Sequence, residues 1–525
     1  MILGIDYGTT RTVVAAADRG NYPAVSFQAE DGNTQEWYPS LIAARAGELR
    51  FGLDAAAAQD QPDWLVVHSF KRELASRGPE SMIELAGRSI TTLDLLTEFL
   101  AALRRDICQR SNLRRARRAE LEAMISVPAN SNSNQRFNTL EAFKGAGFKV
   151  LGMINEPSAA GIEYAHHYMT PLSAEEPVRR TVASRRENVV VYDLGGGTFD
   201  ASVISMADRQ HEVISNSGIA RLGGDDFDAI LLDLALGQAS IQEVSDDARS
   251  RLLQECREKK EGLHPNTRRI VIDLDREIEG AGEAVVSASD FYERCRPLVE
   301  NTIQETDRAL ESESEPISLA SVSAIYQVGG SSSLPVVGRL LRERYGRLVR
   351  KSPYPHASTA IGLAIAADRD AGYQLRERFT RHFGVWREAE GGRSVAFDVL
   401  FPKDTALPEN GHGSLVCSRR YYPAHNVGRF RYLECSRVNG GGQPAGDITP
   451  WDEIGFPFDP ALQNGSDVGD ITVARSAPEG QEIEERYSCD QNGIIRVDII
   501  SHTTGYRRSY LLRGGASTMI GNGKD

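Results

Sequence analysis

The most constraining feature of the sequence is the stretch VVVYDLGGGTFD at residues 189–200. Its apolar run predicts a strand that is buried on both faces. The run ends at Asp193, and three glycines and a threonine follow. Because glycine lacks a Cβ, the N–H groups of such a turn can close around an anion such as phosphate, and Asp193 would lie where a hydrated divalent cation could be held. Taken alone, a glycine-rich turn is equally typical of a structural turn.

The first fifteen residues, MILGIDYGTTRTVVA, repeat this arrangement. An apolar run ends at Asp6, a glycine and two threonines follow, and a second apolar run continues the chain. Agreement in both order and context argues against chance, so the repeat predicts two related lobes that face one nucleotide. A third apolar strand enters the turn at 329–333, which is rich in glycine and serine and predicts a further anion-binding loop.

The whole chain sets limits on domain number and ligand class. Its 525 residues are too many for one hydrophobic core, so two or three domains are expected. The net charge of −13 argues against nucleic acid as the main ligand. The sequence shows no signal-peptide pattern and no apolar run near the roughly 20 residues that span a bilayer. The six cysteines are scattered without a C-x-x-C pair, which favours reduced thiols and a cytoplasmic location.

Three segments invite other interpretations. A helix is predicted from Thr91 to about Arg118, because leucines and other apolar residues recur at helical spacing. A solvated face or a face for an acidic partner is favoured for its arginine-rich distal part over a nucleic-acid patch, since no aromatic residues interleave. The arginines of this part are Arg104, Arg105, Arg110, Arg114, Arg115, Arg117 and Arg118. Adjacent His166 and His167 would point about 100° apart on a helix, so a metal site is disfavoured. Segment 169–187 predicts a surface insertion or loop.

From about residue 383 the pattern changes to short alternating runs separated by clusters of Gly, Asn, Asp and Pro. This pattern of short alternating runs predicts a separate all-β domain. The tetrapeptide DQNG at 490–493 lies between two such runs and predicts a hairpin turn. Residues 437–448, which include three consecutive glycines, predict a loop.

Together these motifs resemble those of the Hsp70-type chaperones, in the actin/Hsp70/hexokinase class of ATPases. The matching motifs are GIDYGTT at 4–10, NEPSAA at 155–160, DLGGGTFD at 193–200, LGGDDFD at 222–228 and VGGS at 328–331. NEPSAA separates this family from actins and sugar kinases. The resemblance implies a two-lobed α/β actin-like ATPase domain with duplicated ribonuclease-H-like lobes at 1–368. A charged linker at 369–382, a β-sandwich for substrate or partner at 383–515 and a flexible tail at 516–525 would follow.

The resemblance also implies a site for ATP or ADP with Mg²⁺. Asp6, Glu156 and Asp193 would hold Mg²⁺ largely through its waters, and Lys71 would position the attacking water. Thr198 would hold a phosphate and is counted with these four as catalytic. Neutralised charge and in-line placement of water are what phosphoryl transfer needs. The remaining nucleotide-binding residues would be Gly8, Thr9, Thr10, Arg11, Gly195, Gly196, Gly197, Gly223, Gly224, Lys260, His264, Gly329, Gly330, Ser331 and Ser333.

The chain departs from the family pattern at several positions. Arg257 replaces an acid, and Glu261 and Ser333 replace two arginines that cover the adenine; weaker ATP binding is therefore expected. Gly152 occupies the position of an arginine that engages J-domain co-chaperones, which leaves those partners and exchange factors uncertain. Residues 71–91 are shorter than the family's equivalent, and the sequence stops after the β domain, without room for a helical lid.

The sequence is compatible with three functions to different degrees. The leading hypothesis is an ATP-driven chaperone-like protein that binds unfolded or extended polypeptide on its β domain. The alternative is a nucleotide-dependent scaffold or sensor with slow ATPase activity and one dedicated protein partner, which the altered linker and Gly152 favour. A sugar kinase or actin-like filament protein fits the phosphate loops but explains neither NEPSAA nor the β domain. Neither nucleic acid nor a membrane is an expected partner.

Overall fold

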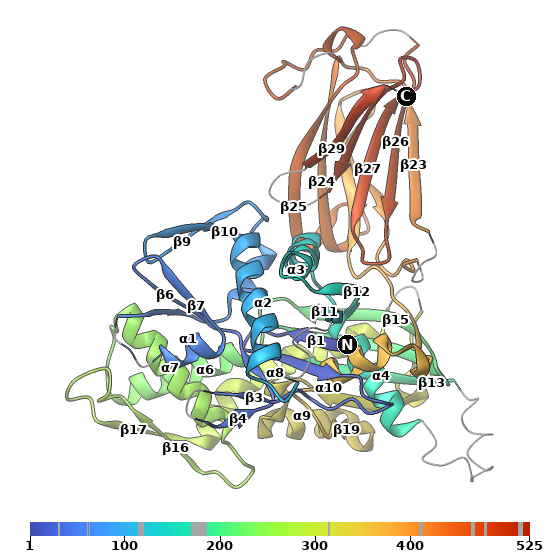
Figure 1. Cartoon of the computed structure of the whole chain (residues 1–525). Helices are drawn as coiled ribbons and strands as arrows, with labels where there is room; N and C mark the ends of the chain where they lie inside the picture. The colour runs from blue at the N-terminus through green and yellow to red at the C-terminus, as the bar shows by residue number, and fades with distance from the viewer. Residues whose placement is uncertain are drawn as a thin grey trace.

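The computed structural model describes the chain except residues 30–31, 60, 62, 114–119, 170–185, 313–314, 409–412, 464–467, 477–479, 513–517 and 525. Four of the predicted arginines, Arg114, Arg115, Arg117 and Arg118, lie outside the described residues, as do most of segment 169–187 and parts of the C-terminal tail. The chain forms a mixed α/β half and a β-rich half, which stands above it in Figure 1. Among the described helices, none combines the length and apolar character needed to cross a membrane.

The first large sheet has five strands in the order β12-β11-β1-β2-β5. At its centre, β1 pairs antiparallel with β2 and parallel with β11. Leu3 and Ile5 of β1 are fully buried, as the apolar pattern predicted, and the strand carries Asp6 near its end. The strands are β1 (Ile2–Tyr7), β2 (Arg11–Ala16), β5 (Tyr38–Pro39), β11 (Glu122–Val127) and β12 (Lys149–Asn155).

The second large sheet repeats this pairing, with the order β19-β18-β13-β14-β15-β20. Its central strand β13 pairs antiparallel with β14 and parallel with β18, so Asp193 takes the place in this sheet that Asp6 has in the first. This agrees with the two related lobes expected from the repeated motif. The strands are β13 (Glu187–Leu194), β14 (Phe199–Ala207), β15 (Gln210–Ile219), β18 (Val322–Val328), β19 (Val349–Lys351) and β20 (Gln374–Arg376).

Two helices join the lobes. α10 (Ser358–Ala367) packs against α4 (Glu156–Tyr168) and against β1. A Cβ on Gly4 would lie 2.2 Å from the Ala360 carbonyl oxygen, and a Cβ on Gly362 would lie 1.8 Å from the Ala159 carbonyl oxygen. Backbone therefore meets backbone at both crossings, which only glycine permits.

The other elements of this half surround the two sheets. Side-chain caps start three helices: Thr91 on α2, Asn132 on α3 and Ser245 on α7. The predicted extension of the first helix to about Arg118 is wrong, because α2 ends at Gln109. The helices are α1 (Leu53–Ala57), η1 (Phe70–Ala75), α2 (Thr92–Gln109), α3 (Ser133–Gly145), α6 (Gly224–Gln238), α7 (Asp246–Glu261), α8 (Ala288–Leu310), η3 (Leu319–Ser321), η4 (Gly330–Ser333), α9 (Pro335–Tyr345), η5 (Gly346–Leu348) and η6 (Arg369–Ala371). The short strands are β3 (Phe27–Gln28), β4 (Thr34–Gln35), β6 (Ile42–Arg45), β7 (Glu48–Phe51), β8 (Leu65–Val67), β9 (Met82–Leu85), β10 (Arg88–Thr91), β16 (Arg269–Asp273) and β17 (Glu283–Ser287).

The β-rich half consists of two sheets that enclose a common core of aromatic and aliphatic side chains. The sheet orders are β22-β21-β24-β25 and β23-β26-β27-β28-β29. Tyr432 from the first sheet and Tyr487 from the second are both buried, and their hydroxyl oxygens lie 3.3 Å apart. The elements are β21 (His382–Ala389), β22 (Ser394–Phe401), β23 (Leu415–Tyr421), β24 (Val427–Val438), β25 (Pro444–Pro457), η7 (Pro460–Leu462), β26 (Ile483–Cys489), β27 (Ile495–Ser501), β28 (Tyr506–Leu511) and β29 (Thr518–Lys524).

Three sequence predictions fall in this half. The hairpin at 490–493 is confirmed, since β26 and β27 pair on either side of it. The predicted loop at 437–448 is wrong: β24 and β25 stay paired as far as Val438 and Pro444, so residues 439–443 alone make the turn. The flexible tail expected at 516–525 is also corrected, because residues 518–524 form β29 and pair with β28. A polar, glycine-rich segment without an apolar pattern can still form a strand, because its backbone groups pair with those of a neighbouring edge strand.

Candidate functional site

A pocket of about 920 Å³ lies where the two large sheets face each other. Strand ends and turns from both lobes supply part of its walls, and residues of η1, α4, α7, α8, η4, α9 and α10 also line it. Most of the predicted site residues line it: Asp6, Gly8, Thr9, Thr10, Arg11, Lys71, Glu156, Asp193, Gly195, Gly196, Thr198, Lys260, His264, Gly329, Gly330, Ser331 and Ser333.

Three predicted glycines do not line the pocket and instead pack behind its wall. The Gly197 carbonyl oxygen accepts hydrogen bonds from Arg72 at 3.0 and 3.2 Å. A Cβ on Gly223 would lie 2.6 Å from the Gly196 backbone, and the Gly224 carbonyl oxygen accepts a 2.7 Å hydrogen bond from Lys260. These glycines are placed to support the turn rather than to touch a ligand.

The two repeated turns lie directly against each other at the pocket. A Cβ on Gly196 would lie 2.3 Å from the Thr10 hydroxyl oxygen, and one on Gly197 would lie 2.7 Å from the Thr9 hydroxyl oxygen. No side chain fits between the turns at these positions, which explains why the second turn is built from glycine. The backbone N–H groups and threonine hydroxyls of both turns are thereby brought to one place, which suits a polyphosphate.

An acid cluster with one lysine lies beside these turns. The Lys71 ammonium, on η1, is 2.6 Å from Glu156 Oε1, the first residue of α4. Ser126 donates a 2.7 Å hydrogen bond to Asp6 Oδ1. Lys71, Glu156 and Asp193 are each less than 10% exposed. Carboxylates from three different elements are therefore held close together with one buried cation.

Burial and mutual repulsion shift the pKa values in this cluster. The pKa of Asp193 is well above its usual value, because the group is buried and Glu156 and Asp6 repel its charge. Burial raises the pKa of Glu156 to about 7 although Lys71 opposes the shift, and burial raises that of Asp200 to about 6. Burial disfavours the ammonium of Lys71, yet the neighbouring Glu156 and Asp6 raise its pKa. Carboxylates that resist ionisation until a cation compensates them are typical of functional sites.

The acid cluster fits a hydrated Mg²⁺. Among the described residues, no group of three His, Cys, Asp or Glu side chains is arranged to bind a metal ion directly. Mg²⁺ keeps several of its waters when it binds proteins and usually takes only one or two carboxylates. The surplus of carboxylates over lysine supplies the charge that such an ion would neutralise, so the residues present are compatible with water-mediated binding.

Two of the departures from the family pattern, Arg257 and Glu261, have defined partners. Arg257 pairs with Asp225 and Asp228 at 2.9 and 3.2 Å, and the Lys260 ammonium lies 2.6 Å from Asp228. Glu261 forms an ion pair with Arg11 of the other lobe. The Arg11 guanidinium also lies 4.2 Å from the centre of the Trp37 ring. The pair thus joins the two lobes at the pocket, a contact that the sequence did not reveal.

Sequence reasoning also missed Arg72 and Tyr292. Arg72 binds the Gly197 carbonyl oxygen and lies 2.8 Å from Asp226, so it ties η1 to the second lobe. The one sequence feature that could have indicated Arg72 as a residue of the site is its position next to Lys71. Tyr292, on α8, lines the pocket without belonging to any of the motifs.

The pocket is next to the contact between the two halves. Asn155, which precedes Glu156, donates hydrogen bonds of 3.0 and 2.8 Å from its backbone and side-chain nitrogens to Glu377 in the predicted linker. The adjacent β20 joins the edge of the second sheet. Arg136, on α3, donates a 2.6 Å hydrogen bond to the Asn155 side chain.

Polar contacts then continue into the β-rich half. Arg136 donates a 3.3 Å hydrogen bond to the Asn492 carbonyl oxygen in the β26–β27 turn. Glu434 of β24 accepts hydrogen bonds from the backbone N–H of Ser133, at 3.2 Å, and from its hydroxyl. Arg136 is 7% exposed and Glu434 is 5% exposed. The two halves therefore meet through buried, hydrogen-bonded polar groups.

A comparison with protein-family models supports what the site suggests. The model described as "Hsp70 protein" matches residues 80–378, which is more than half of the chain. The matched range contains the NEPSAA and DLGGGTFD motifs and most of the second lobe, and it implies an actin-like ATPase fold for this half. The chain belongs to the Hsp70 family.

Proposed function

We propose that this protein binds and hydrolyses ATP in the pocket between its lobes and couples the nucleotide state to polypeptide binding by the β-rich half. The facing glycine–threonine turns beside a buried Lys71–Glu156 pair are the observation that carries the proposal. Members of the Hsp70 family are ATPases that bind unfolded polypeptide. The family match begins after Asp6 and Lys71, so the roles of these two residues rest on geometry and on the motif.

In this proposal the two turns hold the phosphates through N–H groups and the hydroxyls of Thr9, Thr10 and Thr198. Lys71 and Glu156 orient the attacking water, because their pair places a donor and an acceptor side by side at the edge of the acid cluster. Asp6, Asp193 and Glu156 are the residues that would hold Mg²⁺, mostly through its waters. The bound ion supplies neutralisation of the charge on the transferred phosphoryl group.

Lys71→Ala tests the proposal. Single-turnover hydrolysis of ATP should slow by about 100-fold or more, because a group that acts at the reacting atoms is lost. ADP binding, measured by calorimetry, should change by less than about threefold, which a loss of uniform binding would exceed. Lys144→Ala is the matched control, since Lys144 is exposed and pairs only with its helix neighbour Glu141 among the ion pairs described. Unchanged hydrolysis in Lys71→Ala would contradict the proposal.

The β-rich half is proposed as the polypeptide site, with the domain division 1–368, 369–382 and 383–524, since β29 pairs with β28 of this half. The hydrogen bonds of Asn155 to Glu377 and of Arg136 to Asn492 support coupling, because they connect the residue before Glu156 to that half. Binding of a panel of unfolded peptides, with and without ATP, tests this. Broad binding that ATP weakens supports a chaperone.

The second candidate is a nucleotide-dependent scaffold with one dedicated protein partner. The charged linker favours it, since its residues are already engaged with the first half through β20 and Glu377. A single partner in a pull-down, together with no response to the peptide panel, would replace the chaperone proposal with this one.

A further inference from the structure

Three of the cations that line the pocket have no close carboxylate partner. They are Arg339 and Arg342 of α9 and Lys351 of β19, and all three are exposed. Among the described residues, their single ion pair joins Arg339 to Glu343 at 3.9 Å. The other lysines and arginines of the lining are paired more closely: Lys71 with Glu156, Lys260 with Asp228 and Arg11 with Glu261. The pocket therefore contains accessible positive charges that the described residues barely neutralise.

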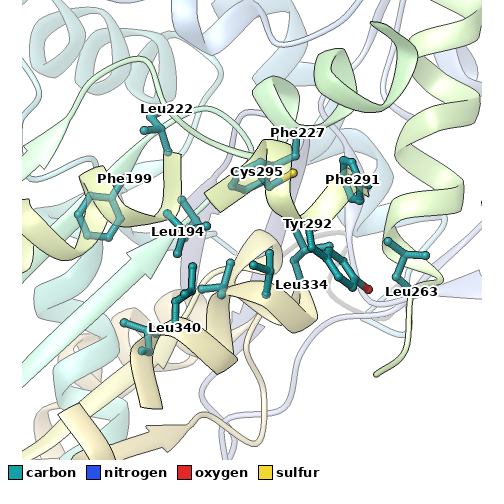
Figure 2. Close-up of a cluster of buried hydrophobic side chains, with 14 of the residues drawn as sticks. Leu194, Phe199, Leu222, Phe227, Leu263, Phe291, Tyr292, Cys295, Leu334 and Leu340 are labelled. Carbon is teal, nitrogen blue, oxygen red and sulfur yellow. The ribbon is translucent and has the colours of Figure 1, made fainter. Parts of the chain in front are cut away.

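The packing of α9 directs its two arginines to the pocket. Leu340 and Leu341 are buried in the core of the second lobe, and Figure 2 shows Leu340 within this cluster. Gly338, Arg339 and Arg342 line the pocket from another face of the helix, since residues three and four apart are neighbours. At a rise of 1.5 Å per residue, the two arginines lie about 6 and 10 Å along the axis from the start of α9. They are thus remote from the η4 turn that precedes the helix.

Lys351 reaches the same part of the pocket from β19. In the parallel pair of β18 and β19 it lies opposite Gln327, and neighbouring strands are about 4.8 Å apart. The Gln327 side chain donates a hydrogen bond to the Ser332 carbonyl oxygen, which fixes its position. A Cβ on Gly338 would lie 3.8 Å from the Gln327 amide and 3.5 Å from the Arg342 guanidinium. Arg342 and Lys351 therefore both adjoin Gln327, one from a helix and one from a strand.

A purely structural role accounts for only part of this basic group. Arg342 lies in the last turn of α9 and donates a 3.4 Å hydrogen bond to the Gly338 carbonyl oxygen, so it complements the helix dipole. Lys351 belongs to a strand and has no such role. Like charges that line one pocket repel one another, and an anion between them removes that repulsion. Guanidinium and ammonium groups are the usual protein ligands of phosphate.

We propose that Arg339, Arg342 and Lys351 bind a phosphate group separate from the phosphates at the glycine–threonine turns. The inference rests on the proposed nucleotide function, because the turns and the acid cluster already account for one polyphosphate with its Mg²⁺. The ligand class is a nucleotide that carries an additional phosphate on its ribose. The same chemistry accepts free inorganic phosphate beside a bound nucleotide, so the test separates these two sources.

Calorimetry with ADP and with ADP that carries a further phosphate on either ribose hydroxyl tests the assignment. At low salt, at least one of the two phosphorylated forms should bind about 5-fold more tightly than ADP, the value of one charge contact at about 4 Å in water. The gain should shrink as salt is added. In the double variant Arg342→Gln/Lys351→Gln the gain should disappear, whereas the affinity for ADP itself should change by less than this factor.

Arg347→Gln is the matched control, since Arg347 is an exposed cation of the same segment outside the pocket lining. It should keep the gain. Inorganic phosphate is also titrated into the ADP-saturated wild type and double variant; binding that only the wild type shows supports the site and identifies free phosphate as its ligand.

The inference would be overturned by a protein that binds ADP but shows neither the gain nor such phosphate binding. A gain that survives in the double variant, or that Arg347→Gln abolishes equally, would overturn it as well. Failure of the wild type to bind ADP would overturn the proposed function together with the inference, and so is distinct from these results.

Discussion

Glu261 and Arg11 show how a single pair of residues can alter a nucleotide site. An acid at position 261 places negative charge in a pocket suited to polyphosphate, and Arg11 compensates it from the other lobe. Their side chains are 30% and 39% exposed for Arg11 and Glu261, so water screens the pair and it adds little to stability. Its effect on a charged ligand should be larger than its effect on the fold.

Glu261→Gln should therefore bind ADP about 2- to 5-fold more tightly than the wild type. The change removes a charge that repels the phosphates and releases Arg11 to attract them. Calorimetry at low salt measures the difference, which should shrink as salt is added. Glu258→Gln on the same helix is the control and should leave affinity unchanged. Weaker ADP binding by Glu261→Gln would show that the interlobe pair itself is what retains the nucleotide.

At the scale of elements, α4 packs on the second sheet through a buried carboxyl. Glu163 is 3% exposed and accepts a 2.6 Å hydrogen bond from Tyr326 of β18. Burial raises its pKa to about 7, although the hydrogen bond opposes the shift. In the unfolded chain the same group ionises near its ordinary pKa of 4.5. The folded state therefore keeps the proton over a range in which the unfolded state has lost it.

The stability that Glu163 contributes is complete below pH about 4.5 and is lost as the pH rises through about 7. Glu163→Gln keeps an acceptor for Tyr326 and cannot ionise, so it should be as stable as the wild type at pH 5. At pH 8 it should be more stable by up to about 3 kcal/mol. Melting temperatures at the two pH values measure this, with the exposed Glu343→Gln as control. A variant that melts lower than the wild type at pH 8 would refute the interpretation.

Local patterns were enough to predict the two strands that end at Asp6 and Asp193, since each strand is apolar on both faces and is followed by glycine. Local patterns did not predict those parts of the structure that depend on pairing between distant segments. Residues 439–443 and β29 owe their form to neighbouring strands, and the contact of Arg72 with Asp226 joins residues 154 positions apart. The place of Tyr292 in the pocket lining has no sequence signal either, because the residue belongs to none of the motifs.

In the whole molecule, the contact between the two halves includes a set of buried polar groups, besides Ile494, which packs against the core of the first lobe. Arg136 is the central one, because it reaches Asn155 on one side and Asn492 on the other. Glu377 and Glu434 both act on its charge. Removing a buried charge leaves the opposite charges uncompensated, at a cost of about 3–5 kcal/mol.

Arg136→Ala should separate the halves. We expect a larger radius of gyration in X-ray scattering and faster proteolysis in segment 369–382, which loses its protection when Glu377 is released. Arg420→Ala, an exposed arginine on β23 that pairs with Glu484, is the control and should change neither measurement. An unchanged scattering curve for Arg136→Ala would show that other contacts are sufficient for docking.

Asn155 and Glu156 are consecutive residues, so the pocket and the boundary between the halves are separated by a single step along the chain. One peptide unit, about 3.8 Å from Cα to Cα, separates the side chain at the pocket from the side chain at the boundary of the halves. Communication between distant sites commonly spans about 20–40 Å of packed protein. Because the peptide unit is planar and rigid, a displacement of the Glu156 Cα also displaces the Asn155 Cα, so no intervening residue is needed to transmit such a movement.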